Sequence, residues 1–180
     1  MNKTLPLLLL LCLAGCRTYD IDGYPPLSKL VERPSLSIFG VHDRTLTTKG
    51  SHVYVGDLDN FLATYPPGSI EWVGKMKHEQ VHGKRQFAYL GLPGEAALSA
   101  WLTRYIVDAG FMWSEEQAGC YVQIKYLQSR AHWPPVRTPH MAERLSKGIY
   151  KTVLGKPMVS YDEALQWIKD VLSGNWTPAE

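Results

Sequence analysis

Residues 78–82 read HEQVH, two histidines four positions apart with a glutamate directly after the first. Positions i and i+4 lie on one face of an α-helix, about one turn apart, so both imidazoles can converge on one metal ion only if this segment is helical. Ser69 offers an N-cap, and Gly91 with Pro93 offers a stop. The sequence therefore predicts a helix from residue 70 to the Gly91 stop that carries this motif.

The three polar residues of the motif have different roles in a zinc site. His78 and His82 supply ligands, whereas Glu79 points to the side and is placed to accept a proton. The sequence thus predicts Zn²⁺ bound by the two histidines, with Glu79 as general base. The competing interpretation is a solvated helix face, because basic residues such as Lys75 and Lys77 lie nearby.

A catalytic zinc ion usually has three protein ligands, so a third must lie elsewhere. Residues 114–117, SEEQ, match a capping box, which predicts a helix starting at Ser114 with two acidic residues in its first turn. Acidic residues there also interact favourably with the helix dipole without any metal. Downstream candidates for the third ligand are Asp108, Glu115, Glu116, His132 and His140.

The segments HEQVHGKRQ, AWLTRY and EEQA, within residues 70–127, resemble the small bacterial and phage zincin-like domains of gluzincin type. The resemblance implies a metallopeptidase whose third ligand is Glu115. Glu116 is the alternative, because a shift of one residue exchanges the two. A metzincin is disfavoured because Arg85 and Ala88 stand where its longer motif needs Gly and His.

Peptide hydrolysis also needs a group that stabilises the oxyanion. Tyr105 is the first candidate, from its place on the intervening helix, and Arg104, His132 and His140 are weaker ones. For Tyr105 the competing interpretation is a core aromatic residue with a satisfied hydroxyl.

The first sixteen residues, MNKTLPLLLLLCLAGC, combine one early lysine with an apolar run of signal-peptide length. The ending resembles the lipobox of bacterial lipoproteins, which implies cleavage before Cys16 and a lipid anchor on it. Arg17, rather than Asp, after the cysteine favours the outer membrane of the cell envelope. An ordinary secretory signal is the alternative.

The charge is nearly balanced, with 19 basic and 17 acidic residues, and nothing in this balance favours a nucleic-acid partner. The expected partners are the membrane, through the lipid, and a protein or peptide substrate. Outside the signal and Cys16, the one remaining cysteine is Cys120, for which a buried position is expected.

The predicted fold class is mainly α (α+β): a zincin-like domain of about five helices with a small N-terminal two-stranded β element. The expected divisions are a signal peptide (1–15), a tether (16–35) and the domain (36–180). The expected strands are 36–41 and 52–56. The helices after the first are expected at 95–110, 114–130, 139–154 and 160–172, the last one opening with a Ser160–Glu163 capping box and ended by Gly174.

Two functions compete at this point, ahead of a third, metal buffering or transfer, which ranks last because the exposed His and Cys ligands that it needs are few. The first is a lipid-anchored zinc-dependent hydrolase, a metallopeptidase in which Glu79 acts as base. The second is a non-catalytic envelope lipoprotein that binds a partner protein, with a structural metal or none.

Overall fold

The computed structural model describes residues 17–32, 46–91, 94–147, 150–153 and 155–178. Within these ranges the chain forms six α-helices and one small four-stranded sheet, which confirms the prediction of a mainly helical α+β fold. The predicted signal segment, Cys16 and the predicted strand 36–41 lie outside the described residues. None of the described helices is long and apolar enough to cross a membrane.

The sheet has the order β1-β2-β4-β3, so β3 is an edge strand. Strand β2 pairs in parallel with β4, and the two outer pairs are antiparallel. The strands are β1 (Thr18–Asp20), β2 (Lys29–Glu32), β3 (Thr47–Lys49) and β4 (His52–Val55). The expectation of a tether through residue 35 is therefore wrong for residues 17–32, because a partner far along the chain supplies hydrogen bonds that local sequence does not reveal.

One face of the sheet packs against α2 (Leu58–Thr64) and α3 (Ile70–Ala88). Phe61 of α2 and Met76 of α3 are fully buried there with Leu30 and Val53. Each such side chain stabilises the fold by about 1.5–3 kcal/mol. Helix α2 was not among the predicted helices, and Asp57 caps it by accepting a hydrogen bond from the Asn60 amide.

Helix α3 begins as predicted, with the Ser69 hydroxyl accepting from the Trp72 amide. Its two glycines allow other segments to approach closely. A Cβ at Gly74 would lie 3.3 Å from Leu127, and one at Gly83 would lie 3.2 Å from Leu27 and 3.3 Å from the carbonyl oxygen of Gly50. These tertiary contacts offset the low helix propensity of glycine.

Helix α4 (Gly94–Val107) is followed almost at once by α5 (Ala109–Ser129). The cap of α5 is Asp108, which accepts from the Phe111 amide at 3.0 Å. The predicted capping box at Ser114 is wrong, because its hydroxyl donates to the carbonyl of Phe111 inside the helix. The acidic pair that follows Ser114 therefore lies in the second turn of α5, facing other helices.

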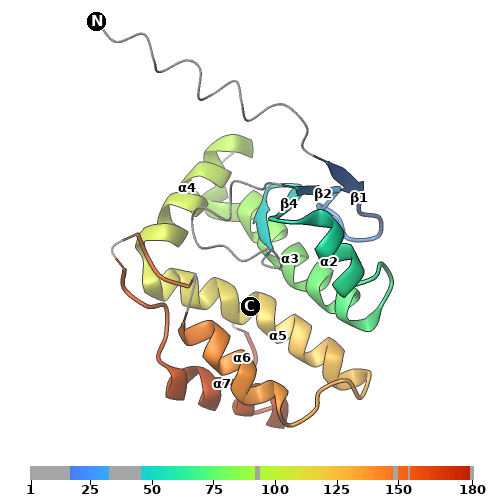
Figure 1. Cartoon of the computed structure of the whole chain (residues 1–180). Helices are drawn as coiled ribbons and strands as arrows, with labels where there is room; N and C mark the ends of the chain where they lie inside the picture. Colours follow the sequence, from blue (N-terminus) through green and yellow to red (C-terminus); the bar gives the residue numbers. More distant parts are fainter. Residues whose placement is uncertain (1–16, 33–45, 92–93, 148–149, 154, 179–180) are drawn as a thin grey trace, which may run out of the picture.

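The C-terminal helices are α6 (Arg137–Ser146) and α7 (Tyr161–Ser173). Helix α6 is shorter than predicted, whereas α7 forms where it was expected, with a capping box between Ser160 and Glu163 and a left-handed Gly174 at its end. Helix α5 lies between α3 on one side and α6 with α7 on the other (Figure 1). The second core, between α5, α6 and α7, includes Ile124, Leu145, Ile168 and Val171.

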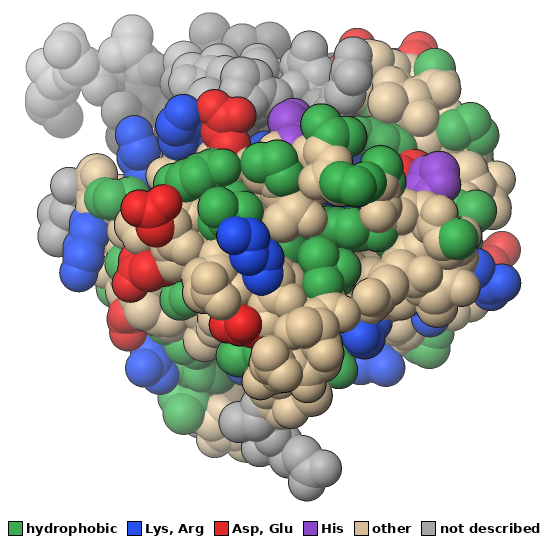
Figure 2. Space-filling model, turned by 90° about the horizontal axis from the view of Figure 1, so that it is seen from below, with side chains coloured by type: hydrophobic (Ala, Val, Ile, Leu, Met, Phe, Trp, Pro, Cys, Tyr) green, Lys and Arg blue, Asp and Glu red, His purple; other side chains and the backbone are tan. Residues whose placement is uncertain are grey.

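The face seen from below carries basic and acidic side chains interspersed, with hydrophobic side chains between them (Figure 2). This face has no broad area of one charge sign, in keeping with the small net charge of the chain.

Candidate metal centre

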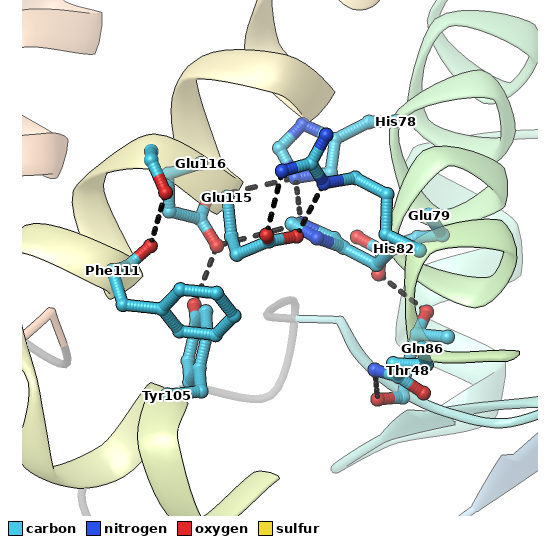
Figure 3. A network of polar contacts seen from close by, with 11 residues as sticks. Thr48, His78, Glu79, His82, Gln86, Tyr105, Phe111, Glu115 and Glu116 are labelled. Atoms are coloured by element: carbon cyan, nitrogen blue, oxygen red, sulfur yellow. Dashed lines mark hydrogen bonds and ion pairs between the residues drawn. The ribbon is translucent and has the colours of Figure 1, made fainter. Parts of the chain in front are cut away.

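The HEQVH motif lies in the middle of α3 and faces α5 (Figure 3). The side chains of His78 and His82 meet Glu116 of α5, and all three are buried. Gly119, nearly one turn after Glu116, makes this approach possible. A Cβ at Gly119 would lie 2.9 Å from the His78 ring, a contact that real Cβ atoms do not make.

The geometry of these three side chains fits a cation. The two Nε2 atoms are 2.9 Å apart, and Glu116 oxygens lie 3.5 Å from His78 Nε2 and 3.4 Å from His82 Nε2. Ligands about 2.0–2.1 Å from a tetrahedral zinc ion are roughly 3.3 Å apart. The two oxygen–nitrogen separations are therefore close to those of a zinc site, whereas the nitrogen–nitrogen separation is that of a hydrogen bond between the two imidazoles.

One unsatisfied buried atom supports a cation at this place, and two others depart from the usual surroundings of a zinc ligand. Among the described residues, Glu116 Oε2 has no hydrogen-bond partner, and neither has the Nδ1 atom of His78 or His82. A buried polar atom without a partner costs free energy, which a bound cation offsets at the carboxylate. Zinc-bound histidines normally donate from their second nitrogen to an oxygen, and the described residues supply no such acceptor.

Glu115, the first choice for the third ligand, faces elsewhere. Both of its oxygens accept from Arg85, Oε2 from Nε at 2.7 Å and Oε1 from Nη2 at 2.8 Å. Neighbouring helical positions point about 100° apart, so Glu115 and Glu116 cannot both face the imidazoles. The structure places the alternative, Glu116, in the cluster, and Glu115 is corrected to an ion-pair role.

Glu79 lies beside the cluster and is held by the sheet edge. Its Oε2 accepts from the Thr48 hydroxyl at 2.7 Å, and Thr48 belongs to β3. Gln86 holds the same strand, donating to the Thr48 carbonyl at 2.9 Å and accepting from the Gly50 amide at 2.7 Å. Helix α3 thus positions β3, and β3 in turn orients the carboxylate of Glu79.

Thr48 and Gln86 were not among the predicted site residues. The signal for Gln86 was its spacing, four positions after His82 and therefore on the same helix face. Thr48 offered no local signal, because only the packing of the sheet brings it to α3.

Tyr105 of α4 donates its hydroxyl proton to Glu116 Oε1 at 2.5 Å. Burial, with the charge of Glu116, raises the pKa of Tyr105 well above its usual value, so the hydroxyl keeps its proton. Burial alone would raise the pKa of Glu116, but the contacts with His78 and His82 outweigh it and hold that pKa well below the usual range. Glu116 is therefore an anion, fixed by a hydroxyl on one oxygen.

The weaker sequence candidates lie away from the cluster. His132 approaches Glu71 at 2.9 Å, and Arg104 pairs with Asp108 at 3.3 Å. His140 lines a third cavity, of about 250 Å³, near the end of α5.

Two cavities meet at His78 and Glu79. The larger, of about 210 Å³, extends towards α4 and is lined by Trp101, Tyr105, Ile106 and other residues. The smaller, of about 40 Å³, extends towards α6. Tyr150 lines both cavities, and burial, then the charge of Glu116, raises the pKa of its hydroxyl well above the usual value. The site therefore has an apolar side and a second, more polar side.

No family model, curated protein or solved structure matches this chain. The function is therefore argued from the chemistry of the site itself.

Proposed function

We propose that this chain is a zinc-dependent hydrolase of the metallopeptidase type. His78, His82 and Glu116 would hold the ion, and Glu79 would act as general base. One observation carries the proposal: His78, His82 and Glu116 form a buried cluster in which the Glu116 oxygens lie at zinc-ligand spacings from the histidine nitrogens. Glu79, the glutamate of the motif, lies beside this cluster and outside it. When bound, zinc acts as a Lewis acid and makes water acidic enough to lose a proton near neutral pH.

The protein's own residues divide the remaining tasks. The hydrogen bond from Thr48 fixes one oxygen of Glu79, which orients the carboxylate for accepting a proton and passing it to the leaving amine. Tyr105 positions Glu116 through its hydrogen bond. Because Tyr105 is engaged in this way, Tyr150, which lines both cavities, is the better-placed donor to a developing oxyanion.

The N-terminal segment adds a location to the proposal. A lipid on Cys16 would hold the domain at a membrane of the bacterial envelope. Arg17 binds Glu32 with two hydrogen bonds of 2.8 Å and Asp59 with one of 2.6 Å, and β1 starts at Thr18. The folded domain would then begin directly after the anchor. The proposed location is tested by comparing how wild-type protein and the Cys16→Ser variant distribute between the membrane and soluble cell fractions.

The test of catalysis combines metal content with cleavage of an unstructured peptide mixture, read by mass spectrometry. We expect one zinc per chain in wild type and in Glu79→Gln, with hydrolysis reduced about 10²–10⁴-fold in the variant. Glu95→Gln, which removes an exposed carboxylate from α4, is the control and should keep full activity.

Full activity in Glu79→Gln would refute the role of the base. Zinc binding without any cleavage by wild type would favour the alternative, an envelope lipoprotein that binds a partner protein around a structural metal.

A further inference from the structure

Two basic side chains line the smaller cavity beside Glu79. Lys75 lies on α3, one turn before Glu79, and Arg144 reaches the cavity from α6. Among the described residues neither forms an ion pair with a carboxylate. The Lys75 ammonium instead lies 4.4 Å from the centre of the Tyr65 ring. The cavity beside the candidate base therefore holds two cations that form no ion pair within the described ranges, and the carboxylate that shares its lining is Glu79.

Neighbouring basic residues differ in this respect. Arg137, which lines the adjoining cavity, is bound to Glu71, and Lys147 on α6 is bound to Glu143 at 2.9 Å. Burial, followed by the repulsion of Arg144, lowers the pKa of Lys75 to about 8. The carboxylates of Glu79 and Glu71 partly offset this lowering, so the half-buried Lys75 is mostly charged at neutral pH.

The two basic residues also continue outward from the site. Lys75, Gln123, Met141 and Arg144 line both the small cavity and the adjoining cavity of about 250 Å³. On the opposite side of Glu79 lies the apolar cavity of about 210 Å³. A substrate lying across Glu79 would meet apolar walls on one side and two cations on the other.

We propose that Lys75 and Arg144 form a carboxylate-binding subsite of the hydrolase. The substrate class is then a peptide with an apolar residue on one side of the scissile bond and a carboxylate close to it on the other. This inference rests on the proposed function. The small cavity, at about 40 Å³, has room for only a few water-sized groups, which favours a carboxylate held directly beside the bond.

The carboxylate has two possible sources, a free C-terminus or an acidic side chain. Three peptides separate them: acetyl-Phe-Ala with a free carboxylate, acetyl-Phe-Ala-amide and acetyl-Phe-Glu-amide. Their binding is measured by calorimetry on full-length, zinc-loaded Glu79→Gln protein in detergent, so that cleavage does not interfere. We expect at least one of the two charged peptides to bind ten- to hundredfold more tightly than the neutral amide.

Charge removal at the subsite should abolish this preference. Arg144→Gln and Lys75→Gln, each made in the Glu79→Gln background, are expected to bind the three peptides alike. Lys84→Gln, which removes an exposed charge from the same helix α3, should leave the preference unchanged. Equal binding of all three peptides to the parent protein would overturn the subsite. A charge preference in a protein whose wild type cleaves nothing would keep the subsite and refute the hydrolase.

Stability distinguishes a binding role from a structural one. If the role of Lys75 is to bind the carboxylate of a peptide, the Lys75→Met variant should have an unchanged or higher Tm without peptide. The charged peptide, which raises the Tm of the parent protein, should no longer raise the Tm of this variant. A lower Tm, with the rise caused by peptide retained, would show that Lys75 serves packing against Tyr65 and would overturn its part in the subsite.

Discussion

The two sides of α5 bury different kinds of side chain, apolar on one side and charged on the other. Towards α6 and α7 it packs Cys120 and Ile124 against apolar partners such as Leu145 and Ile168, as in an ordinary core. Towards α3 the same helix presents two buried carboxylates to histidines and an arginine. One side stabilises the fold by removing apolar surface from water. The other side buries charged groups, and their desolvation costs free energy. Such a cost is expected at a site that binds a cation.

The apolar side should show the largest effect on stability. Ile168→Ala is expected to lower the free energy of unfolding by about 2–5 kcal/mol, because the side chain is fully buried and leaves a cavity. Urea denaturation measures this loss. Zinc stoichiometry in the folded variant should stay at the wild-type value, and a loss of zinc at low urea would show that the two sides of α5 are coupled.

The helix contact at the site depends on Gly119. Gly119→Ala is expected to weaken zinc binding strongly and to destabilise the fold by about 1–3 kcal/mol, since its Cβ would overlap the His78 ring. Competition with a chelator measures the zinc affinity. Gly110→Ala, on the same helix but with its nearest contact at 3.4 Å, is the matched control and should be neutral or slightly stabilising. Equal zinc affinities in the two variants would argue against the proposed ligand geometry.

The hydroxyl of Tyr105 should have the smallest of these effects. Tyr105→Phe is expected to reduce zinc affinity about 10–100-fold, because Glu116 loses the hydrogen bond that orients it. If Tyr105 were instead an oxyanion donor, zinc affinity would stay unchanged while kcat fell. Chelator competition and steady-state kinetics on the same preparations separate these two roles.

Local sequence predicted some elements well and others poorly. Helix α7 follows its capping box and terminating glycine, both set by residues within a few positions. The start of α5 was missed because Asp108 and Ser114 are both acceptable caps, and only the packing of the helix selects the first. Strands β1 and β2 were missed because three- and four-residue strands depend on partners distant in sequence.

The candidate site shows the same division. The spacing of His78 and His82 on α3 follows from the period of a helix, so the sequence alone determined that both imidazoles share a face with Glu79 beside them. Whether Glu115 or Glu116 joins them depends on the rotation of α5, which the Arg85 ion pair and Gly119 set. The hydrogen bond from Thr48 to Glu79 likewise forms only because the edge strand β3 lies against α3. Periodicity is a local property of the chain, but the meeting of α3, α5 and β3 is decided by packing among residues far apart in sequence.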